Sequence, residues 1–211
     1  MTVPLPASYA ALVPFPTLRP AQQKALDAGL LDGVNLLIAT PTASGKTVIA
    51  TLALARSVAA GKRGVYIAPL KALASEKARA FASVSAFTSA LSIGDSAEHD
   101  DNLGSIDVII TTPEKLDSLV RNGAHWITSI GCIVVDEVHL LSDASRGPTL
   151  EVLITLLRTL LPHAHLVALS ATVSNAHELA AWLGATLVED TWRPVPLREA
   201  TLVTGSLRYK K

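Results

Sequence analysis

Short hydrophobic runs alternate with helix-like patterns along most of this chain. Within each run, hydrophobic residues mostly follow one another directly instead of alternating with polar ones, which is typical of β-strands covered on both faces. Strands separated by helices in this way predict βαβ units around a mainly parallel sheet. The predicted strands are residues 35–39, 64–68, 107–111, 132–135, 165–169 and 186–188.

Helical patterns fill several intervals between these strands. Helices are predicted over residues 21–28 and 45–60, and Gly61 supplies the glycine with which helices often end. A third helix is predicted over residues 147–162, where Pro148 stands near the start and a broad hydrophobic stripe indicates packing against the sheet. We therefore predict an α/β fold with three layers, built as one domain.

The composition supports a single folded domain. Of the 211 residues, 49% are hydrophobic and 17% charged, which favours a well-filled core and excludes extensive disorder. Lys and Arg together number 18, as do Asp and Glu, and this balance argues against strong non-specific binding of nucleic acid by this segment alone. The first 20 residues contain five prolines, so residues 1–19 are predicted to be a lead-in to a domain spanning residues 20–192.

Two features bear on where the protein works. Cys132 is the single cysteine and can form no internal disulfide, which favours a reducing, cytoplasmic location. No hydrophobic stretch reaches the roughly 18–20 residues of a membrane-spanning helix, so no membrane partner is expected.

The stretch "ATPTASGKTVIA", residues 39–50, joins a predicted strand to a predicted helix through small side chains. It fills the G-x-x-x-x-G-K-[ST] template except at the first position, where Thr40 replaces glycine. Backbone N–H groups are expected to converge on a phosphate at the positive end of the helix. Lys46 is expected to neutralise nucleotide phosphates and the Thr47 hydroxyl to ligate Mg²⁺, whereas a plain helix-capping turn is the alternative. The predicted nucleotide-binding residues of this turn are Thr40, Thr42, Ala43, Ser44, Gly45, Lys46 and Thr47.

A second motif, "CIVVDEVH", offers the partner that a magnesium site needs. Its hydrophobic strand delivers Asp136 at the carboxyl end, the edge at which ligands bind in parallel sheets. Asp136 is the second predicted metal ligand, acting through water because Mg²⁺ keeps much of its hydration shell. Glu137 is expected to orient and deprotonate the attacking water, which makes Glu137 and Lys46 the predicted catalytic residues. Adjacent acids can also cap a helix, but together with the upstream turn they indicate a nucleoside triphosphatase.

The remaining motifs select among classes of nucleoside triphosphatase. No N-K-x-D motif of GTPases and no L-S-G-G-Q motif of ABC-type ATPases occurs. Instead, residues 136–139 read D-E-V-H, and residues 170–172 read S-A-T after another hydrophobic strand. In this order the motifs resemble those of the first RecA-like domain in superfamily 2 helicases of the DExH kind.

This resemblance spans about residues 18–200. "LRPAQQKAL" resembles the glutamine motif, "APLKALASEK" resembles motif Ia, and "TTPEKLDSL" resembles motif Ib. The details "PLKALASEK", "DEVHLLSDASRGPTLE" and "TWRPVPLRE" resemble the Ski-type branch, most closely archaeal repair helicases related to HELQ and to the helicase part of DNA polymerase theta. The resemblance implies a RecA-like P-loop fold, ATP and Mg²⁺ as cofactors, and DNA unwinding in repair.

The resemblance also implies roles for residues outside the two main motifs. Gln22 would read adenine. His139, Ser170 and Thr172 would couple the state of the γ-phosphate to the grip on the strand, and we hypothesise a hydrogen-bonded bridge between their two motifs. Motifs Ia and Ib would hold the backbone of one nucleic-acid strand, although their lysines taken alone are ordinary surface residues. The implied strand contacts are Pro69, Lys71, Thr112, Pro113 and Lys115.

Motors of this family contain two RecA-like domains, and the second supplies arginines to the transferring phosphate. No Q-x-x-G-R-x-G-R motif occurs in this chain, so residues 193–211 are predicted to lead towards an absent second domain. We therefore expect nucleotide binding, very slow hydrolysis and no unwinding by this chain alone. The implied partners are single-stranded or forked DNA and the second RecA-like domain. An RNA helicase of the same branch and a non-catalytic nucleotide-binding interaction module stay open as alternatives.

Overall fold

The computed structural model describes residues 4–13, 17–94, 103–196, 200–203 and 206–209, the last two ranges by their backbone alone. Within these ranges, seven parallel strands form one sheet in the order β3-β4-β2-β5-β6-β1-β7. The strands are β1 (Leu36–Ala39), β2 (Arg63–Ile67), β3 (Ser89–Ser92), β4 (Val108–Thr111), β5 (Ile130–Val135), β6 (His165–Ser170) and β7 (Thr186–Glu189). The predicted parallel α/β fold is confirmed.

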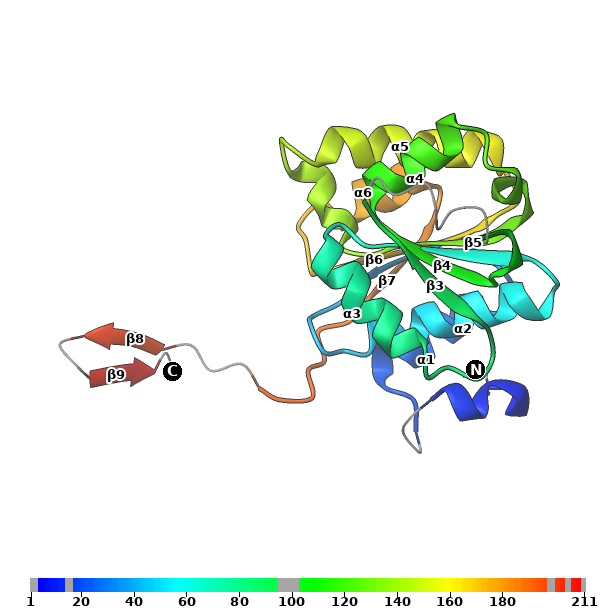
Figure 1. Ribbon diagram of the computed structural model, residues 1–211. Coiled ribbons are helices and arrows are strands. Elements are labelled where there is room, and N and C mark those ends of the chain that lie inside the picture. The colour runs from blue at the N-terminus through cyan, green and yellow to red at the C-terminus, as the bar shows by residue number, and fades with distance from the viewer. Residues whose placement is uncertain (1–3, 14–16, 95–102, 197–199, 204–205, 210–211) are drawn as a thin grey trace.

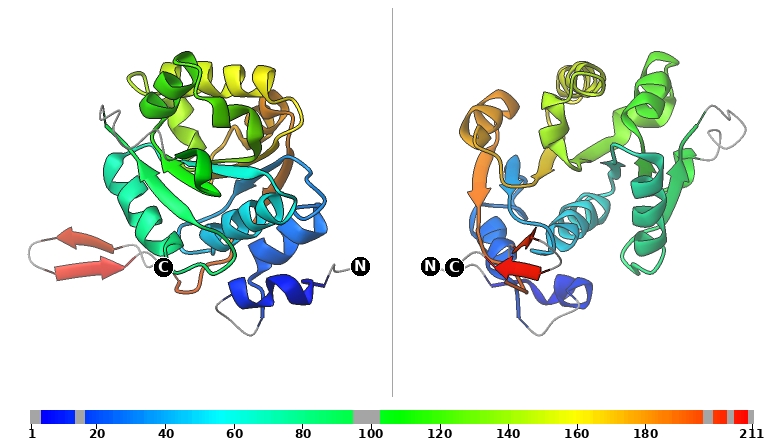
Figure 2. Two further views of the ribbon diagram at one scale, coloured as in Figure 1. Left: turned by 45° about the vertical axis from the view of Figure 1, so that its right-hand side comes forward. Right: turned by 90° about the vertical axis from the view of Figure 1, so that its left-hand side faces the viewer.

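Helices cover both faces of the sheet, with α1, α2 and α3 on one face and α4, α5 and α6 on the other (Figures 1 and 2). Helices α1, α2 and α5 confirm the three predicted helices, with ends within two residues of those expected. The α-helices are α1 (Pro20–Asp27), α2 (Lys46–Ala59), α3 (Lys71–Phe81), α4 (Pro113–Arg121), α5 (Gly147–Leu160) and α6 (Ala176–Leu183). The 3-10 helices are η1 (Ala7–Leu12), η3 (Leu103–Ser105), η4 (His125–Ser129) and η5 (Val138–Ser142).

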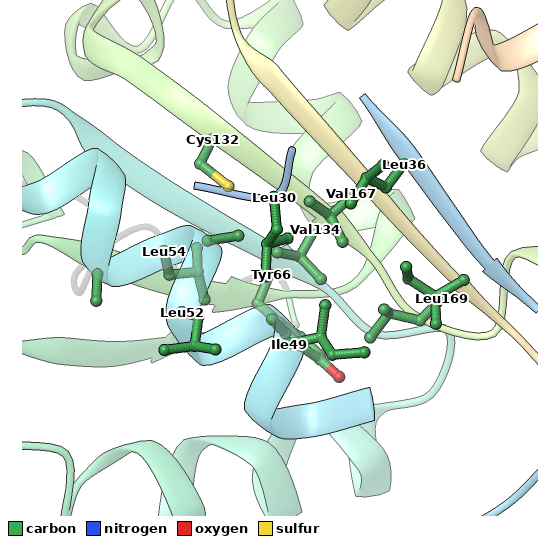
Figure 3. Packing of buried hydrophobic residues seen from close by; sticks show 14 of the residues in the cluster. Leu30, Leu36, Ile49, Leu52, Leu54, Tyr66, Cys132, Val134, Val167 and Leu169 are labelled. Carbon is green, nitrogen blue, oxygen red and sulfur yellow. The ribbon is translucent and has the colours of Figure 1, made fainter. Parts of the chain in front are cut away.

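Two hydrophobic clusters, one on each face, hold the layers together. Alternate residues of each strand enter opposite clusters, so Leu36 and Ile38 pack towards α2 whereas Leu37 packs towards α5 and α6. Figure 3 shows the first cluster, in which Ile49 of α2 lies against side chains of β2, β5 and β6. Each fully buried Leu or Ile contributes about 1.5–3 kcal/mol relative to exposure, so α2 is firmly held against the sheet. The amino end of α2 is therefore a rigid platform for the turn that precedes it.

The strand order decides which motifs meet. Strand β6 lies between β1 and β5, so the segments that follow these three parallel strands share one edge of the sheet. Strands β2 and β4 are also neighbours and continue the same edge on the other side of β5. The turn at residues 40–47 (motif I), D-E-V-H at residues 136–139 (motif II) and S-A-T at residues 170–172 (motif III) thus leave one half of this edge, and motifs Ia and Ib leave the other half.

Two strand regions and helix α6 were not predicted. Strand β3 pairs with β4 at the edge of the sheet, and its sequence "SALS" lacks the hydrophobic run of a strand buried on both faces. In the predicted C-terminal segment, β8 (Ala200–Val203) and β9 (Ser206–Tyr209) form an antiparallel hairpin (Figure 1). The proposed boundaries at residues 19 and 192 stay predictions; residues 1–3 and 14–16 of the lead-in, and 197–199, 204–205 and 210–211 at the other end, lie outside the described residues.

Among the described residues, no helix combines the length and the hydrophobicity needed to cross a bilayer.

Candidate nucleotide-binding site

The turn between β1 and α2 is tight, and its backbone explains its small residues. Gly45 has a φ of 101°, in the left-handed region that favours glycine, and Ala43 has a φ of 65°. A Cβ added at Gly45 would lie 2.3 Å from Nε2 of Gln22, so any side chain there must displace the glutamine. Helix α2 starts at the next residue, and its free N–H groups face the mouth of the turn.

Two residues of the turn brace it from the inside. The side-chain oxygens of Thr40 and Ser44 are 2.8 Å apart, and both residues are buried. The Thr40 hydroxyl thus supplies an internal hydrogen bond at the position where the template has glycine. Thr40 and Ser44 support the loop from below, whereas Thr42, Ala43, Gly45, Lys46 and Thr47 line the cavity above it.

Lys46 lies where the resemblance requires a phosphate-binding lysine. Its Nζ donates to the carbonyl of Thr40 at 2.8 Å and reaches that of Pro41 at 3.5 Å. Burial lowers the pKa of Lys46 from its ordinary value, and the carboxylates of Glu137 and Asp136 oppose this shift. The ammonium is thus held at the base of the cavity, within the field of both acids.

Gln22 lies behind the turn instead of facing the cavity. Its Oε1 accepts from the backbone N of Arg19 at 2.9 Å, and its Nε2 donates to the carbonyl of Gly45 at 3.3 Å. The residue is fully buried and does not line the cavity. The contacts of Gln22 therefore tie the start of α1 to the turn, and its adenine-reading role stays a prediction.

Asp136 is held in place by two hydrogen bonds. The hydroxyl of Tyr66 donates to Oδ2 at 2.5 Å, and the backbone N of Glu137 donates to Oδ1 at 3.0 Å. Burial raises the pKa of Tyr66 well above its usual range, and the negative charge of Asp136 raises it further, so the hydroxyl stays protonated as a donor. Sequence reasoning missed Tyr66; the signal is a tyrosine between Val65 and Ile67 in a buried strand, because a buried hydroxyl normally has a partner.

These groups surround a cavity of about 260 Å³ at the carboxyl edge of the sheet. Three cationic side chains, Arg19, Lys46 and Lys77, face two carboxylates, Asp136 and Glu137, and of the cations only Lys46 was predicted. The guanidinium of Arg19 also donates to the carbonyl of Ala43 at 2.6 Å. The lining residues are Arg19, Thr42, Ala43, Gly45, Lys46, Thr47, Tyr66, Lys77, Asp136, Glu137, Leu169 and Pro194.

The donors in this cavity fit a magnesium nucleotide. A hydroxyl from Thr47 and a carboxylate from Asp136 are hard oxygen ligands, which suit Mg²⁺ that keeps most of its water. Within the described ranges, no three His, Cys, Asp or Glu side chains gather as a metal site of their own. The helix N-terminus and the surplus cation on the walls fit the phosphates that would accompany the metal.

Motifs II and III meet through His139. The backbone N of Ala171 donates to Nδ1 of His139 at 3.5 Å, and the same Nδ1 lies 3.3 Å from Oε2 of Glu137. Nδ1 accepts from Ala171 only when it carries no proton, and donates to Glu137 only when it does. The hydroxyls of Ser170 and Thr172 take no part, because Ser170 Oγ is buried without a hydrogen-bond partner and Thr172 is exposed. The contact between the motifs thus runs through the backbone.

The predicted strand contacts lie at the starts of α3 and α4, which follow the neighbouring strands β2 and β4 and cover opposite faces of the sheet (Figure 1). Helix α3 begins at Lys71, which is exposed, and α4 begins at Pro113 after Thr112, whose hydroxyl accepts from the backbone N of Lys115 at 3.5 Å. Pro69, Thr112 and Pro113 are buried, and Lys115 is only 9% exposed. Lys71 is therefore the predicted strand contact whose side chain is most accessible, whereas the others lie buried at or beside the two helix starts.

Comparison with known proteins agrees with this geometry. The sequence profile described as DEAD/DEAH box helicase matches residues 19–179. The ATP-dependent DNA helicase Hel308 of Methanocella arvoryzae is 45% identical over 93% of this chain, that of Pyrococcus abyssi 47% over 89%, and that of Methanocaldococcus jannaschii 49% over 91%. The chain spans 28%, 26% and 17%, respectively, of the lengths of these relatives.

Proposed function

The chain belongs to the DEAD/DEAH box helicase family, and from that premise we propose that it is the ATP-binding motor domain of an ATP-dependent DNA helicase that acts in DNA repair. The observation that carries the proposal is the cavity at the amino end of α2, where Lys46 and Thr47 face Asp136 and Glu137. Each of the three Hel308 relatives is named as a DNA helicase.

The residues of the cavity divide the chemistry between them. The backbone N–H groups of the turn and the Lys46 ammonium hold the β- and γ-phosphates of ATP. Thr47 and Asp136 hold Mg²⁺, which when bound neutralises charge on the phosphates. Glu137 accepts a proton from the water that attacks the γ-phosphate. Tyr66 positions Asp136 by donating to its Oδ2.

Replacing Tyr66 with phenylalanine is expected to lower the affinity of the nucleotide-bound chain for Mg²⁺ by about tenfold, a typical effect of losing a hydrogen bond to a metal ligand. The ring, which packs edge-on against Phe81 at 5.3 Å between centroids, is retained, so the fold should be preserved. Magnesium titrations of a bound fluorescent ATP analogue measure the effect. An unchanged magnesium dependence would show that the Tyr66 hydroxyl does not support the metal ligand.

We propose that His139 couples changes in charge within the cavity to motif III. Its Nδ1 lies at hydrogen-bond distance from both Glu137 and the backbone N of Ala171. A change in the charge around Glu137 therefore bears directly on the strand end at which Ser170 and Thr172 lie. This arrangement supports the coupling role expected for His139, whereas the roles of the Ser170 and Thr172 hydroxyls stay predictions.

DNA is the proposed substrate, held along the half of the edge formed by β2 and β4. The exposed Lys71 and the N–H groups at the starts of α3 and α4 suit phosphates of a single strand. The second RecA-like domain of the same motor is the proposed partner that closes the cavity, and a cytoplasmic location is proposed from the free, buried Cys132.

Strand-stimulated ATP hydrolysis by the complete protein tests the proposal. Single-stranded DNA is expected to raise the rate well above the basal rate, and an RNA strand of the same sequence is expected to stimulate it less. Equal stimulation by RNA would favour an RNA motor of the same branch. No stimulation by either strand would refute a helicase motor.

A further inference from the structure

Lys77 lines the cavity from α3, the helix that follows β2 on the half of the sheet edge proposed to bind DNA. It lies in the second turn of α3, the helix that begins with the proposed strand contact Lys71. Its Nζ donates to Oγ1 of Thr47 at 3.3 Å, and its side chain is only 15% exposed. Thr47 Oγ1 is the oxygen that the proposed function assigns to Mg²⁺. A lysine and a divalent cation would therefore use the same ligand atom.

The charges that surround Lys77 favour an anion in the cavity. Lys77 lines the cavity together with Lys46 and Arg19, and its charge helps to lower the pKa of Lys46, after burial, which is the main cause. Two ammonium groups that face one cavity repel each other unless a negative group lies between them. Asp136 and Glu137 offset this repulsion in part, and the exposed Glu76 lies 3.9 Å from the Lys77 ammonium, but the three cations that line the cavity exceed its two lining carboxylates by one. Phosphate oxygens would remove the imbalance.

We propose that Lys77 is a second nucleotide-site lysine, which holds the metal side of the cavity at Thr47 until Mg²⁺ binds. Without metal, its ammonium offsets the charge of the bound phosphates beside Thr47. With metal, Thr47 Oγ1 would ligate Mg²⁺, and the Lys77 ammonium would leave that atom because two cations repel at such short range. The inference rests on the proposed nucleotide function and adds a positioning residue to it.

Nucleotide affinities measured with and without Mg²⁺ distinguish this role of Lys77 from a purely structural one. In Lys77→Met, affinity for a fluorescent, non-hydrolysable ATP analogue should fall by about tenfold without metal, the effect of losing one charged hydrogen bond. With saturating Mg²⁺ the loss should be much smaller, because the metal already occupies the Thr47 oxygen. The magnesium stimulation of binding, defined as the ratio of the two dissociation constants, should therefore increase in the variant.

The experiment measures both dissociation constants for this chain, for Lys77→Met, for Lys77→Arg and for Arg79→Met. Arg79 is an exposed residue of the same helix that does not line the cavity, so Arg79→Met matches the change in net charge and should leave the ratio unchanged. Lys77→Arg keeps the charge and should stay close to the parent ratio. Circular dichroism verifies that each variant is folded. If Lys77→Met is not folded, the ratios of dissociation constants of Lys77→Arg and Arg79→Met are compared instead.

The results separate this inference from the proposed function. The inference is supported if the ratio of the two dissociation constants increases in Lys77→Met and in no other variant. The inference is overturned if the parent binds nucleotide but Lys77→Met loses affinity equally with and without Mg²⁺. It is also overturned if Lys77→Met and Arg79→Met have the same ratio of dissociation constants. Both results leave the proposed function intact. If Lys77→Met is not folded, the comparison uses Lys77→Arg and Arg79→Met. The inference is then overturned if the ratio of dissociation constants differs from that of the parent in Lys77→Arg but not in Arg79→Met. A parent chain that binds no nucleotide overturns both.

Discussion

Replacing Glu137 with glutamine in the complete protein is expected to lower strand-stimulated ATP hydrolysis by about 10²–10⁴-fold, the range that a general base contributes. The amide keeps the size of the side chain but is a poor proton acceptor. Glu137 follows Asp136 with a φ of 49°, a left-handed conformation that turns its side chain to line the same cavity as Lys46. Affinity for an ATP analogue should be retained, because the phosphate-binding groups are untouched. Steady-state hydrolysis and equilibrium binding measure the two effects.

Glu151→Gln is the matched control for this variant. Glu151 is exposed on α5, on the opposite face of the sheet from α2, and does not line the cavity. The control should hydrolyse ATP at the parent rate. Equal losses in Glu137→Gln and Glu151→Gln, or full activity in both, would contradict the assignment of Glu137 as the base.

This chain alone is expected to hydrolyse ATP about 10³–10⁵-fold more slowly than it does together with the proposed second RecA-like domain, which would supply arginines to the transferring phosphate. The cavity of about 260 Å³ lies just below the roughly 300–1,000 Å³ of typical ligand pockets, as expected for a site completed by another domain. Its cations, Arg19, Lys46 and Lys77, all come from this chain. Strand-stimulated hydrolysis is measured for the chain with and without the second domain added as a separate polypeptide.

Restored hydrolysis on adding the second domain would support the motor. Unwinding of a duplex by this chain alone at ordinary motor rates would contradict the prediction. Nucleotide binding without any restored hydrolysis would favour the alternative of a non-catalytic interaction module.

The five strands inside the sheet, β4, β2, β5, β6 and β1, were predictable because burial on both faces imposes a composition. Strands such as β1 and β5 accept hardly any polar residue, so a hydrophobic run marks them in the sequence. The two edge strands need no such run, because their residues are partly exposed: β7 has a short hydrophobic stretch and was predicted, whereas β3 lacks one and was missed. The same reasoning located the carboxyl edge at which the two main motifs meet.

The candidate site was predictable only where its residues are neighbours in the sequence. The turn before α2 and the D-E pair after β5 are short motifs, and both line the cavity. Tyr66, Lys77 and Arg19 come from separate elements, and only the folded chain brings them to Asp136, Thr47 and Ala43, respectively. No local pattern encodes such long-range pairs, which is why the sequence did not reveal them.

Binding of a magnesium ATP analogue by this chain, compared with its Lys46→Ala variant, tests the central claim most directly. The claim predicts saturable binding by the parent, strengthened by Mg²⁺, and affinity about 10–100-fold lower in Lys46→Ala, the effect of removing a hydrogen bond between charged groups. Equal affinity of the two proteins, or no binding by the folded parent, would contradict it.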